Sequence, residues 1–124
     1  MILGFKPQFN NKVKKNIKVH TIREDIGNRW KPGNSIQFFN GVRTKEMTKF
    51  TYDRVCVSVQ KIKIDWSYFE YLNAPAIFID DRQITEIEKI LLATNDGFDL
   101  LFDFYEWFNK DFEGVIIHWT DLKY

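Results

Sequence analysis

The segment Val55-Cys56-Val57-Ser58-Val59-Gln60-Lys61-Ile62-Lys63-Ile64 predicts a β-strand near the middle of the chain. Its apolar and polar residues alternate, as they do in a strand that buries one face. The apolar residues occupy odd positions up to Val59 and even positions from Ile62 onward. This shift at Lys61 predicts a β-bulge, because an extra residue there changes the face on which the later side chains lie.

Shorter strands are predicted on both sides of this segment. Each is a short apolar or alternating run: Ile2–Phe5, His20–Arg23, Ser35–Phe39, Ala76–Ile79 and Val115–Trp119. Asn40-Gly41 directly follows one of them and is a strong signal for a hairpin turn. Residues 10–17 are polar and rich in lysine and predict a loop or a short helix, and residues 25–34 predict a loop with turn-forming residues.

Two helices are predicted in the second half of the chain. The first has apolar residues at helical spacing, with Thr85 as its N-cap or an early residue: Ile84, Ile87, Ile90 and Leu91. The second follows the break at residues 95–97, and its apolar residues predict a stripe that faces the core: Leu101, Phe102, Tyr105, Phe108 and Phe112. Early strands, two late helices and a final strand predict an α+β fold, a small closed or half-closed β-barrel with both helices packed at one end.

The composition indicates a single domain that spans residues 1–124. Hydrophobic residues make up 44% of the chain and aromatic residues 17%, which is enough for a core without disulfides. The one cysteine, Cys56, is expected to be a small core residue, and this cysteine usage fits a reducing cytoplasm. The sequence shows no signal peptide, no apolar run of transmembrane length and no metal-ligand pattern. We therefore expect a cytoplasmic protein with no membrane association, no metal and no cofactor.

The net charge of +1 conceals two halves of opposite sign. Residues 1–63 hold 14 of the 18 lysines and arginines and four acids, a charge of +10. Residues 64–124 hold four basic residues and 13 acids, a charge of −9. A basic half that contains Trp30, Phe38 and Phe39 is typical of a nucleic-acid surface. Two alternatives remain: the charges pair across one folded domain, or the acidic helical half binds a protein partner.

The segment Lys18-Val19-His20-Thr21-Ile22-Arg23 combines an amine, a hydroxyl and a guanidinium in one short run. Thr21 and Arg23 share a face of the predicted strand because they are two residues apart. Lys18 is three residues before Thr21, so it joins them only if the chain turns or bulges between them. A lysine that loses its proton can activate a nearby hydroxyl as a nucleophile. The alternative is a solvated sheet edge that carries no chemistry.

Three short motifs, in this order, resemble the ASCH superfamily: Lys18-x-x-Thr21-x-Arg23, then Lys31-Pro32-Gly33 before a strand, then Ala93-x-x-Asp96-Gly97-Phe98 before a helix. The match runs from Phe5 to Trp119, and it is carried by the order and spacing of the motifs. The resemblance implies a β-barrel similar to the PUA RNA-binding domain, in a bacterial or phage protein. It also implies a cleft that recognises RNA, a nucleotide or a modified nucleoside.

Within this superfamily, the chain is similar to the small bacterial acetylcytidine amidohydrolases. Their lysine, threonine and glutamate fall on Lys18, Thr21 and Asp96. The resemblance therefore implies Lys18 as the base, Thr21 as the nucleophile and Asp96 as the proton donor to the leaving amine. Arg23 would lower the Lys18 pKa, orient the substrate or stabilise an oxyanion.

Two alternatives to this catalytic interpretation remain. Asp96 replaces the family's glutamate and is one methylene shorter, and an aspartate just before a helix can instead cap that helix. The same cleft can also hold a ligand without turnover, because a fold does not fix a function.

Three further features are candidates for binding or for packing. Arg29-Trp30-Lys31 offers two cations and an aromatic face that suit a phosphate and a base, or else a loop anchored by a buried tryptophan. His20 faces away from Thr21 on the predicted strand, and His118 lies in the final strand. Both histidines are expected to be packed or hydrogen-bonded structural residues.

Overall fold

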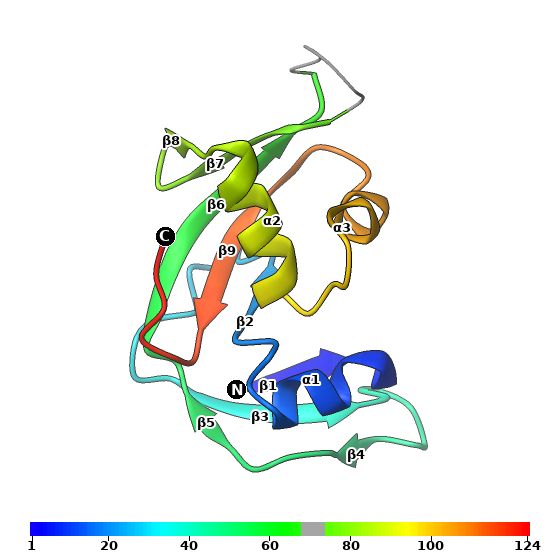
Figure 1. Ribbon diagram of the computed structural model, residues 1–124. Helices are drawn as coiled ribbons and strands as arrows, with labels where there is room; N and C mark the ends of the chain where they lie inside the picture. Colours follow the sequence, from blue (N-terminus) through cyan, green and yellow to red (C-terminus); the bar gives the residue numbers. More distant parts are fainter. Residues whose placement is uncertain (68–73) are drawn as a thin grey trace.

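The computed structural model describes residues 1–67 and 74–124, which form two β-sheets and three short α-helices (Figure 1). The first sheet consists of β1 (Ile2–Phe5), β3 (Ser35–Asn40), β4 (Thr48–Lys49) and β5 (Arg54–Val55). The strands of the second sheet lie in the order β2 (His20–Arg23), β9 (Phe112–His118), β6 (Ser58–Asp65), β7 (Ala76–Ile79) and β8 (Arg82–Gln83). The helical segments are the 3-10 turn η1 (Pro7–Phe9), α1 (Asn10–Lys14), α2 (Glu86–Asn95) and α3 (Leu101–Trp107). The predicted α+β class is confirmed.

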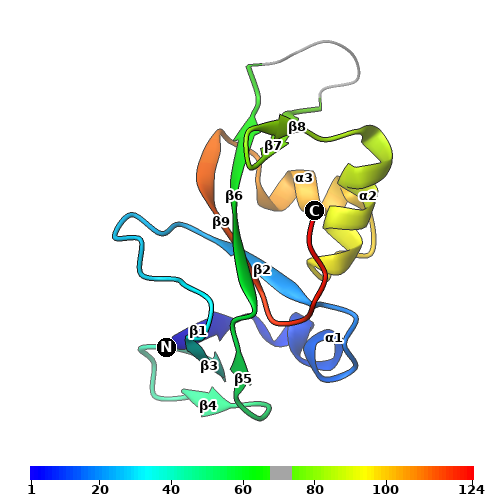
Figure 2. The same cartoon turned by 90° about the vertical axis from the view of Figure 1, so that its left-hand side faces the viewer.

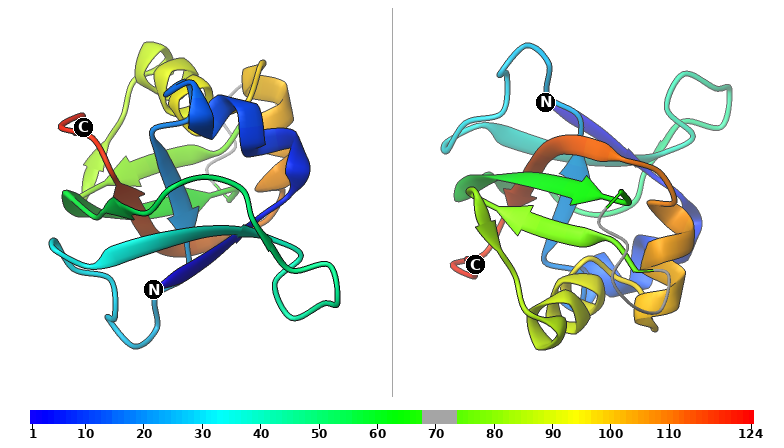
Figure 3. Two further views of the ribbon diagram at one scale, coloured as in Figure 1. Left: turned by 90° about the horizontal axis from the view of Figure 1, so that it is seen from below. Right: turned by 90° about the horizontal axis from the view of Figure 1, so that it is seen from above.

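The two sheets differ in the direction of their strands. β1 runs parallel to β3, whereas β4 and β5 pair with β3 in the antiparallel direction. The second sheet is antiparallel throughout its described pairings. α2 and α3 cover one face of the second sheet, and the loop after β2 lies on the other side (Figure 2). Figure 3 shows that β3 runs across the direction of β2, so the two sheets form crossed layers.

The strand pairings of the described residues form two open sheets rather than one closed barrel. The chain passes from the first sheet to the second between Cys56 and Val57. Cys56 N donates to Asn34 O at 2.8 Å beside the first sheet, and Val57 N donates to His118 O at 2.8 Å beside the second. This exchange of partners within two residues joins the two layers along one side.

β6 carries no bulge at Lys61, so this prediction is wrong. The strand pairs with β9 without interruption over residues 58–64. Its inward residues are Gln60, Ile62 and Ile64, all at even positions, whereas Val57 on the odd side is 43% exposed. The apolar pattern shifts at Lys61 because the polar Gln60 occupies an inward position, where its amide is hydrogen-bonded.

α2 forms where it is predicted, but it buries a different face. Thr85 is its N-cap and forms a capping box with Glu88, in which each side chain accepts from the backbone N–H of the other residue. The buried side chains of the helix are Lys89, Leu92 and Ala93. The predicted apolar positions Ile87, Ile90 and Leu91 are 73%, 53% and 51% exposed.

The second predicted helix is shorter than its apolar pattern. α3 ends at Trp107, and Phe112 belongs to β9. Phe104, outside the predicted stripe, is fully buried, whereas Phe102 is 64% exposed. The Phe104 ring packs against the Phe108 ring with centroids 4.9 Å apart. Phe108 also packs against Phe112 of β9, with ring centroids 5.3 Å apart, and this contact joins the end of α3 to the start of β9.

Candidate functional site

A pocket with a volume of about 600 Å³ opens between the segments around β1, β2 and α3. It is lined by four residues that the sequence singles out: Lys18, Thr21, Arg23 and Asp96. Aromatic side chains form much of the remaining wall: Phe5, Phe9, Phe98, Trp107, Phe108 and Phe112. The fold thus brings together polar residues from segments that are 78 positions apart in sequence.

Lys18 reaches the pocket from the short connection between α1 and β2. Its backbone N–H donates to Lys12 O at 3.0 Å, and the N–H of Val19 donates to Asn95 O at 2.9 Å. These two bonds tie the connection to α1 and to the end of α2 before β2 begins. Because Lys18 lies outside the strand, its odd spacing to Thr21 does not send the side chains to opposite faces.

Asp96 lies at the end of α2, and the prediction that it caps the following helix is wrong. Its N–H donates to Leu92 O at 3.0 Å, and α3 begins only at Leu101. Lys18 Nζ donates to Asp96 Oδ1 at 2.9 Å and to the Asp96 carbonyl oxygen at 2.6 Å. Gly97 follows with φ +94°, a conformation that favours glycine, and this turn leaves the carboxylate directed at Lys18.

Lys18 and Asp96 form an ion pair inside the pocket wall, with side chains that are 3% and 4% exposed. Burial lowers the pKa of Lys18, although the Asp96 carboxylate opposes this effect, and Arg23 adds a smaller repulsion in the same direction as burial. Burial alone would raise the pKa of Asp96, but the Lys18 ammonium and the His20 hydrogen bond outweigh it and lower that pKa. Asp96 is therefore ionised at neutral pH, and Lys18 gives up its proton more easily than an exposed lysine.

The Arg23 guanidinium binds the hydroxyl group of Thr21. Arg23 Nε donates to Thr21 Oγ1 at 3.3 Å, Nη2 donates to Gly4 O at 2.7 Å, and the group lies 4.9 Å from the centre of the Phe5 ring. Within residues 1–67 and 74–124, the Lys18 amine and the Thr21 hydroxyl form no hydrogen bond with each other. Proton transfer between them would need a bridging water or a shift of the lysine side chain.

Arg29, Trp30 and Lys31 lie outside this pocket. Trp30 is 9% exposed and belongs to the core, so the predicted stacking face for a base is wrong. Asp25 holds this loop, because its carboxylate accepts from the backbone N–H groups of Arg29 at 2.8 Å and Trp30 at 3.0 Å. Phe38 is also fully buried. Two of the three aromatic residues that suggested a nucleic-acid surface on the basic half therefore pack inward.

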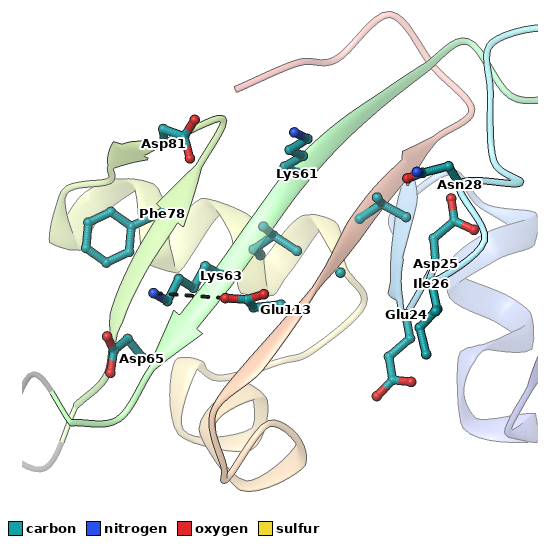
Figure 4. A pocket seen from close by; sticks show the side chains of 13 residues that line it. Glu24, Asp25, Ile26, Asn28, Lys61, Lys63, Asp65, Phe78, Asp81 and Glu113 are labelled. Atoms are coloured by element: carbon teal, nitrogen blue, oxygen red, sulfur yellow. Dashed lines mark ion pairs between the residues drawn. The ribbon is translucent and has the colours of Figure 1, made fainter.

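A second hollow, of about 780 Å³, lies on the face of the five-stranded sheet that α2 and α3 do not cover (Figure 4). Most of its labelled side chains are charged, and Lys63 Nζ lies 4.0 Å from Glu113 Oε1. Sequence reasoning missed this hollow. The signal that could have found it is the row of outward polar residues on β6, at positions 61, 63 and 65.

Sequence reasoning also missed Tyr124, which lies behind the Lys18–Asp96 pair. Its hydroxyl is 2.6 Å from His20 Nε2. His20 and His118 are both fully buried, as expected, and His118 Nε2 lies 2.9 Å from Gln60 Oε1. No pattern in the sequence connects residue 124 with residue 20, because the contact depends on the path of the chain after β9.

The part of the chain that the structure describes contains no group of three His, Cys, Asp or Glu side chains arranged to hold a metal ion. None of its helices is long and apolar enough to cross a membrane. Comparisons with protein-family models, with curated proteins and with solved structures find no match for this chain.

Proposed function

We propose that the pocket binds a nucleoside unit: a nucleotide, a modified nucleoside or an unpaired base of an RNA. The supporting observation is that Lys18, Thr21, Arg23 and Asp96, from two distant segments, line one pocket with aromatic walls. Its volume of about 600 Å³ lies within the usual range of small-molecule sites. Trp107 offers a stacking face to a base, and Arg23 offers N–H groups to a carbonyl or phosphate oxygen.

The same convergence supports the proposal that the chain is an ASCH-like domain with a PUA-like fold. Its two motif segments, residues 18–23 and 93–98, are far apart in sequence and both contribute to the pocket wall. In this interpretation, the crossed layers of the β1–β3 pair and the five-stranded sheet correspond to a PUA-like barrel that is open between its two sheets.

A second candidate function, amide hydrolysis on an acylated cytidine, is favoured by the buried amine of Lys18. Because burial lowers its pKa, Lys18 forms the neutral amine more easily than an exposed lysine does. The neutral amine would take the proton of the Thr21 hydroxyl, and the Thr21 oxygen would attack the acyl carbon. Arg23 would stabilise the negative oxygen of the tetrahedral intermediate.

In this scheme, Asp96 has a different role from the one that the resemblance implies. Its lowered pKa keeps it ionised, so it has no proton to donate at neutral pH. Lys18, protonated in the first step, would give that proton to the leaving amine as the C–N bond breaks. Asp96 would hold the lysine in place during both transfers, and water would then cleave the Thr21 ester.

A fluorescence titration tests the binding proposal. Trp107 lines the pocket and is 44% exposed, so a base stacked on it should quench its emission. The titrants are cytidine, cytidine monophosphate and N4-acetylcytidine. Because the chain contains four tryptophans, the variant Trp107→Phe identifies the signal from the pocket. Arg23→Gln should weaken binding, whereas Lys31→Gln removes an exposed cation outside the pocket and should bind as the wild type does.

The titration and a deacylation assay together separate the two functions. Saturable quenching without loss of the acetyl group's absorbance supports a binding site alone. Loss of that absorbance in the wild type, but not in Thr21→Ala, supports the hydrolase. The absence of saturable quenching with all three compounds would overturn the proposal of a nucleoside site.

A further inference from the structure

A buried row of hydrogen bonds continues from the pocket wall into the interior. Asp96 Oδ1, which accepts from Lys18, also lies 3.2 Å from Nδ1 of the fully buried His20. On the other side of the ring, His20 Nε2 lies 2.6 Å from the Tyr124 hydroxyl. Asn95 Nδ2 donates to the same hydroxyl at 3.1 Å.

The chemistry of these groups fixes the direction of each bond. Asp96 is ionised and can only accept, so His20 Nδ1 must carry the proton that it donates to Asp96. Burial keeps His20 neutral by lowering its pKa, although the hydrogen bond to Asp96 opposes this. The second nitrogen, Nε2, is therefore an acceptor, and Tyr124 must donate to it. The amide of Asn95 donates to the Tyr124 oxygen, so all the donors point toward the carboxylate.

Tyr124 is itself held from behind by one side chain. Its backbone N–H donates to Gln60 Oε1 at 2.9 Å, and its backbone oxygen accepts from Gln60 Nε2 at 2.7 Å. The His20 ring also packs edge-on against the His118 ring, with centroids 5.2 Å apart. Neither Tyr124 nor His20 lines the pocket, and the hydrogen bond between His20 and Asp96 connects both residues to its wall.

We propose that His20 and Tyr124 are positioning residues: the directed bonds from Tyr124 through His20 to Asp96 fix the carboxylate that holds the Lys18 amine at the pocket wall. This proposal depends on the proposed function in one respect only, which is the identity of the ligand that the pocket binds. The hydrogen bond from His20 reduces the basicity of the Asp96 carboxylate. The carboxylate therefore stabilises the protonated form of Lys18 less than it would without this bond.

The charged and titratable groups around this row, with Lys123 and Asp80 beside His118, enter the expected pH dependence. Lys18 is influenced by Asp96, Arg23 and Lys12. His20 is influenced by Asp96 and Lys18, and its ring lies against those of Tyr124 and His118. His118 stays neutral because burial lowers its pKa to about 3. The change in Lys18 titration when His20 is altered therefore reports on Asp96.

The first experiment is an NMR measurement on the ligand-free protein, with ¹⁵N–¹H correlations of the histidine rings at neutral pH. We expect His20 as the neutral tautomer with its proton on Nδ1. A proton on Nε2 in the wild type would overturn the proposal without any variant. In Tyr124→Phe the donor to Nε2 is lost while Asp96 still accepts from Nδ1, so we expect the same tautomer with the ¹⁵N resonance of Nε2 shifted toward that of an acceptor without a hydrogen bond. An Nε2 resonance unchanged in Tyr124→Phe would mean that Tyr124 does not donate to His20 and only fills space.

The second experiment follows the titration of Lys18 by the chemical shifts of its side chain. We expect His20→Ala to raise the pKa of Lys18, because Asp96 loses a hydrogen-bond donor and holds the lysine proton more strongly. His20→Asn keeps an N–H near the position of Nδ1 and should restore most of the wild-type titration. Equal shifts in His20→Asn and His20→Ala would contradict the positioning role.

These measurements test the positioning proposal separately from the proposed function. If the NMR results agree and no nucleoside quenches Trp107, the positioning proposal stands and the nucleoside site is wrong. If a nucleoside binds and the titration of Lys18 is the same in all variants, the nucleoside site stands and the positioning proposal is wrong.

Discussion

Replacement of Asp96 by asparagine removes a buried charge and keeps the local shape. Oδ1 of Asp96 is the atom that contacts both Lys18 Nζ, at 2.9 Å, and His20 Nδ1, at 3.2 Å. An asparagine oxygen in the same position would still accept from both groups. The variant Asp96→Asn therefore isolates the electrostatic part of the interaction and leaves Lys18 as an unpaired cation in the wall.

Two independent estimates bound the loss of stability. Breaking a buried ion pair by removing one partner costs about 3–5 kcal/mol. Lys18 can avoid the cost of a buried unpaired charge by losing its proton on folding. Deprotonation of a lysine with the ordinary pKa of 10.5 costs about 5 kcal/mol at pH 7, which sets the upper bound. The loss should therefore be about 3–5 kcal/mol, which for 124 residues lowers Tm by about 12–20 °C.

The pH dependence identifies the cause of this loss. In the unfolded chain Lys18 keeps its proton up to about its ordinary pKa, whereas the folded variant releases it at lower pH, so the unfolded state binds more protons. The stability of Asp96→Asn relative to the wild type should thus rise with pH, by up to about 1.4 kcal/mol per unit. Urea unfolding followed from about pH 6 to about pH 9 measures this slope.

Two controls accompany the measurement. Lys12 and Asp99 form an ion pair with N···O at 2.6 Å, but Asp99 is 83% exposed, so Asp99→Asn should change stability little. The double variant Lys18→Met with Asp96→Leu replaces the buried pair by apolar groups and should recover part of the loss; it recovers no more because His20 Nδ1 loses its acceptor. A deficit in Asp96→Asn below about 1 kcal/mol, or one that is the same at every pH, would refute the assignment of Lys18–Asp96 as a charged buried pair.

Three further predictions concern the surroundings of the pocket, a helix end and the cysteine. Gly97→Ala should destabilise by more than about 1 kcal/mol in urea unfolding, because φ is +94° and the new Cβ would lie 3.0 Å from the side chain of Lys18. Thr85→Ala should cost about 1 kcal/mol through loss of the N-cap, while Thr94→Ala on the exposed side of the same helix should have no comparable effect in thermal unfolding. Cys56 is 1% exposed and burial raises its pKa, so a thiol reagent should modify it in urea and not in buffer; rapid modification of the native protein would contradict its burial.

The sequence predicts the position of a strand or helix correctly where a short apolar run or a capping residue marks it. β1, β2 and β7 lie where the apolar runs predict them, and Thr85 caps α2 as expected. The segments that carry the pocket were also identifiable, because Lys18, Thr21 and Arg23 combine chemistry in one short run. Their convergence with Asp96 depends on the path of the chain over the intervening residues, and their roles in binding or catalysis remain predictions.

The errors on β6 and α2 have one physical origin, which is that their buried positions include polar groups. Gln60 on β6 and Lys89 on α2 occupy inward positions, where hydrogen bonds satisfy their polar atoms. A pattern that assigns every apolar residue to the core therefore places Val57 and Ile90 on the wrong side. The reverse error affects Trp30, which lies in a polar loop and still packs into the core. Such positions are fixed by partners far away in sequence, which periodicity does not contain.

The bond between Lys18 and Asp96 spans 78 residues, and this separation has a consequence for the chain during its synthesis. All strands of the first sheet lie within residues 2–55, so that layer can assemble while the ribosome is still producing the second half. At that moment β2 lacks its neighbour β9, and the Lys18 amine lacks its partner Asp96. A stalled nascent chain that ends before residue 96 would present β2 as an unpaired edge, which other chains can pair with. The growing polypeptide should therefore be most vulnerable to aggregation between the completion of β5 and the emergence of β9.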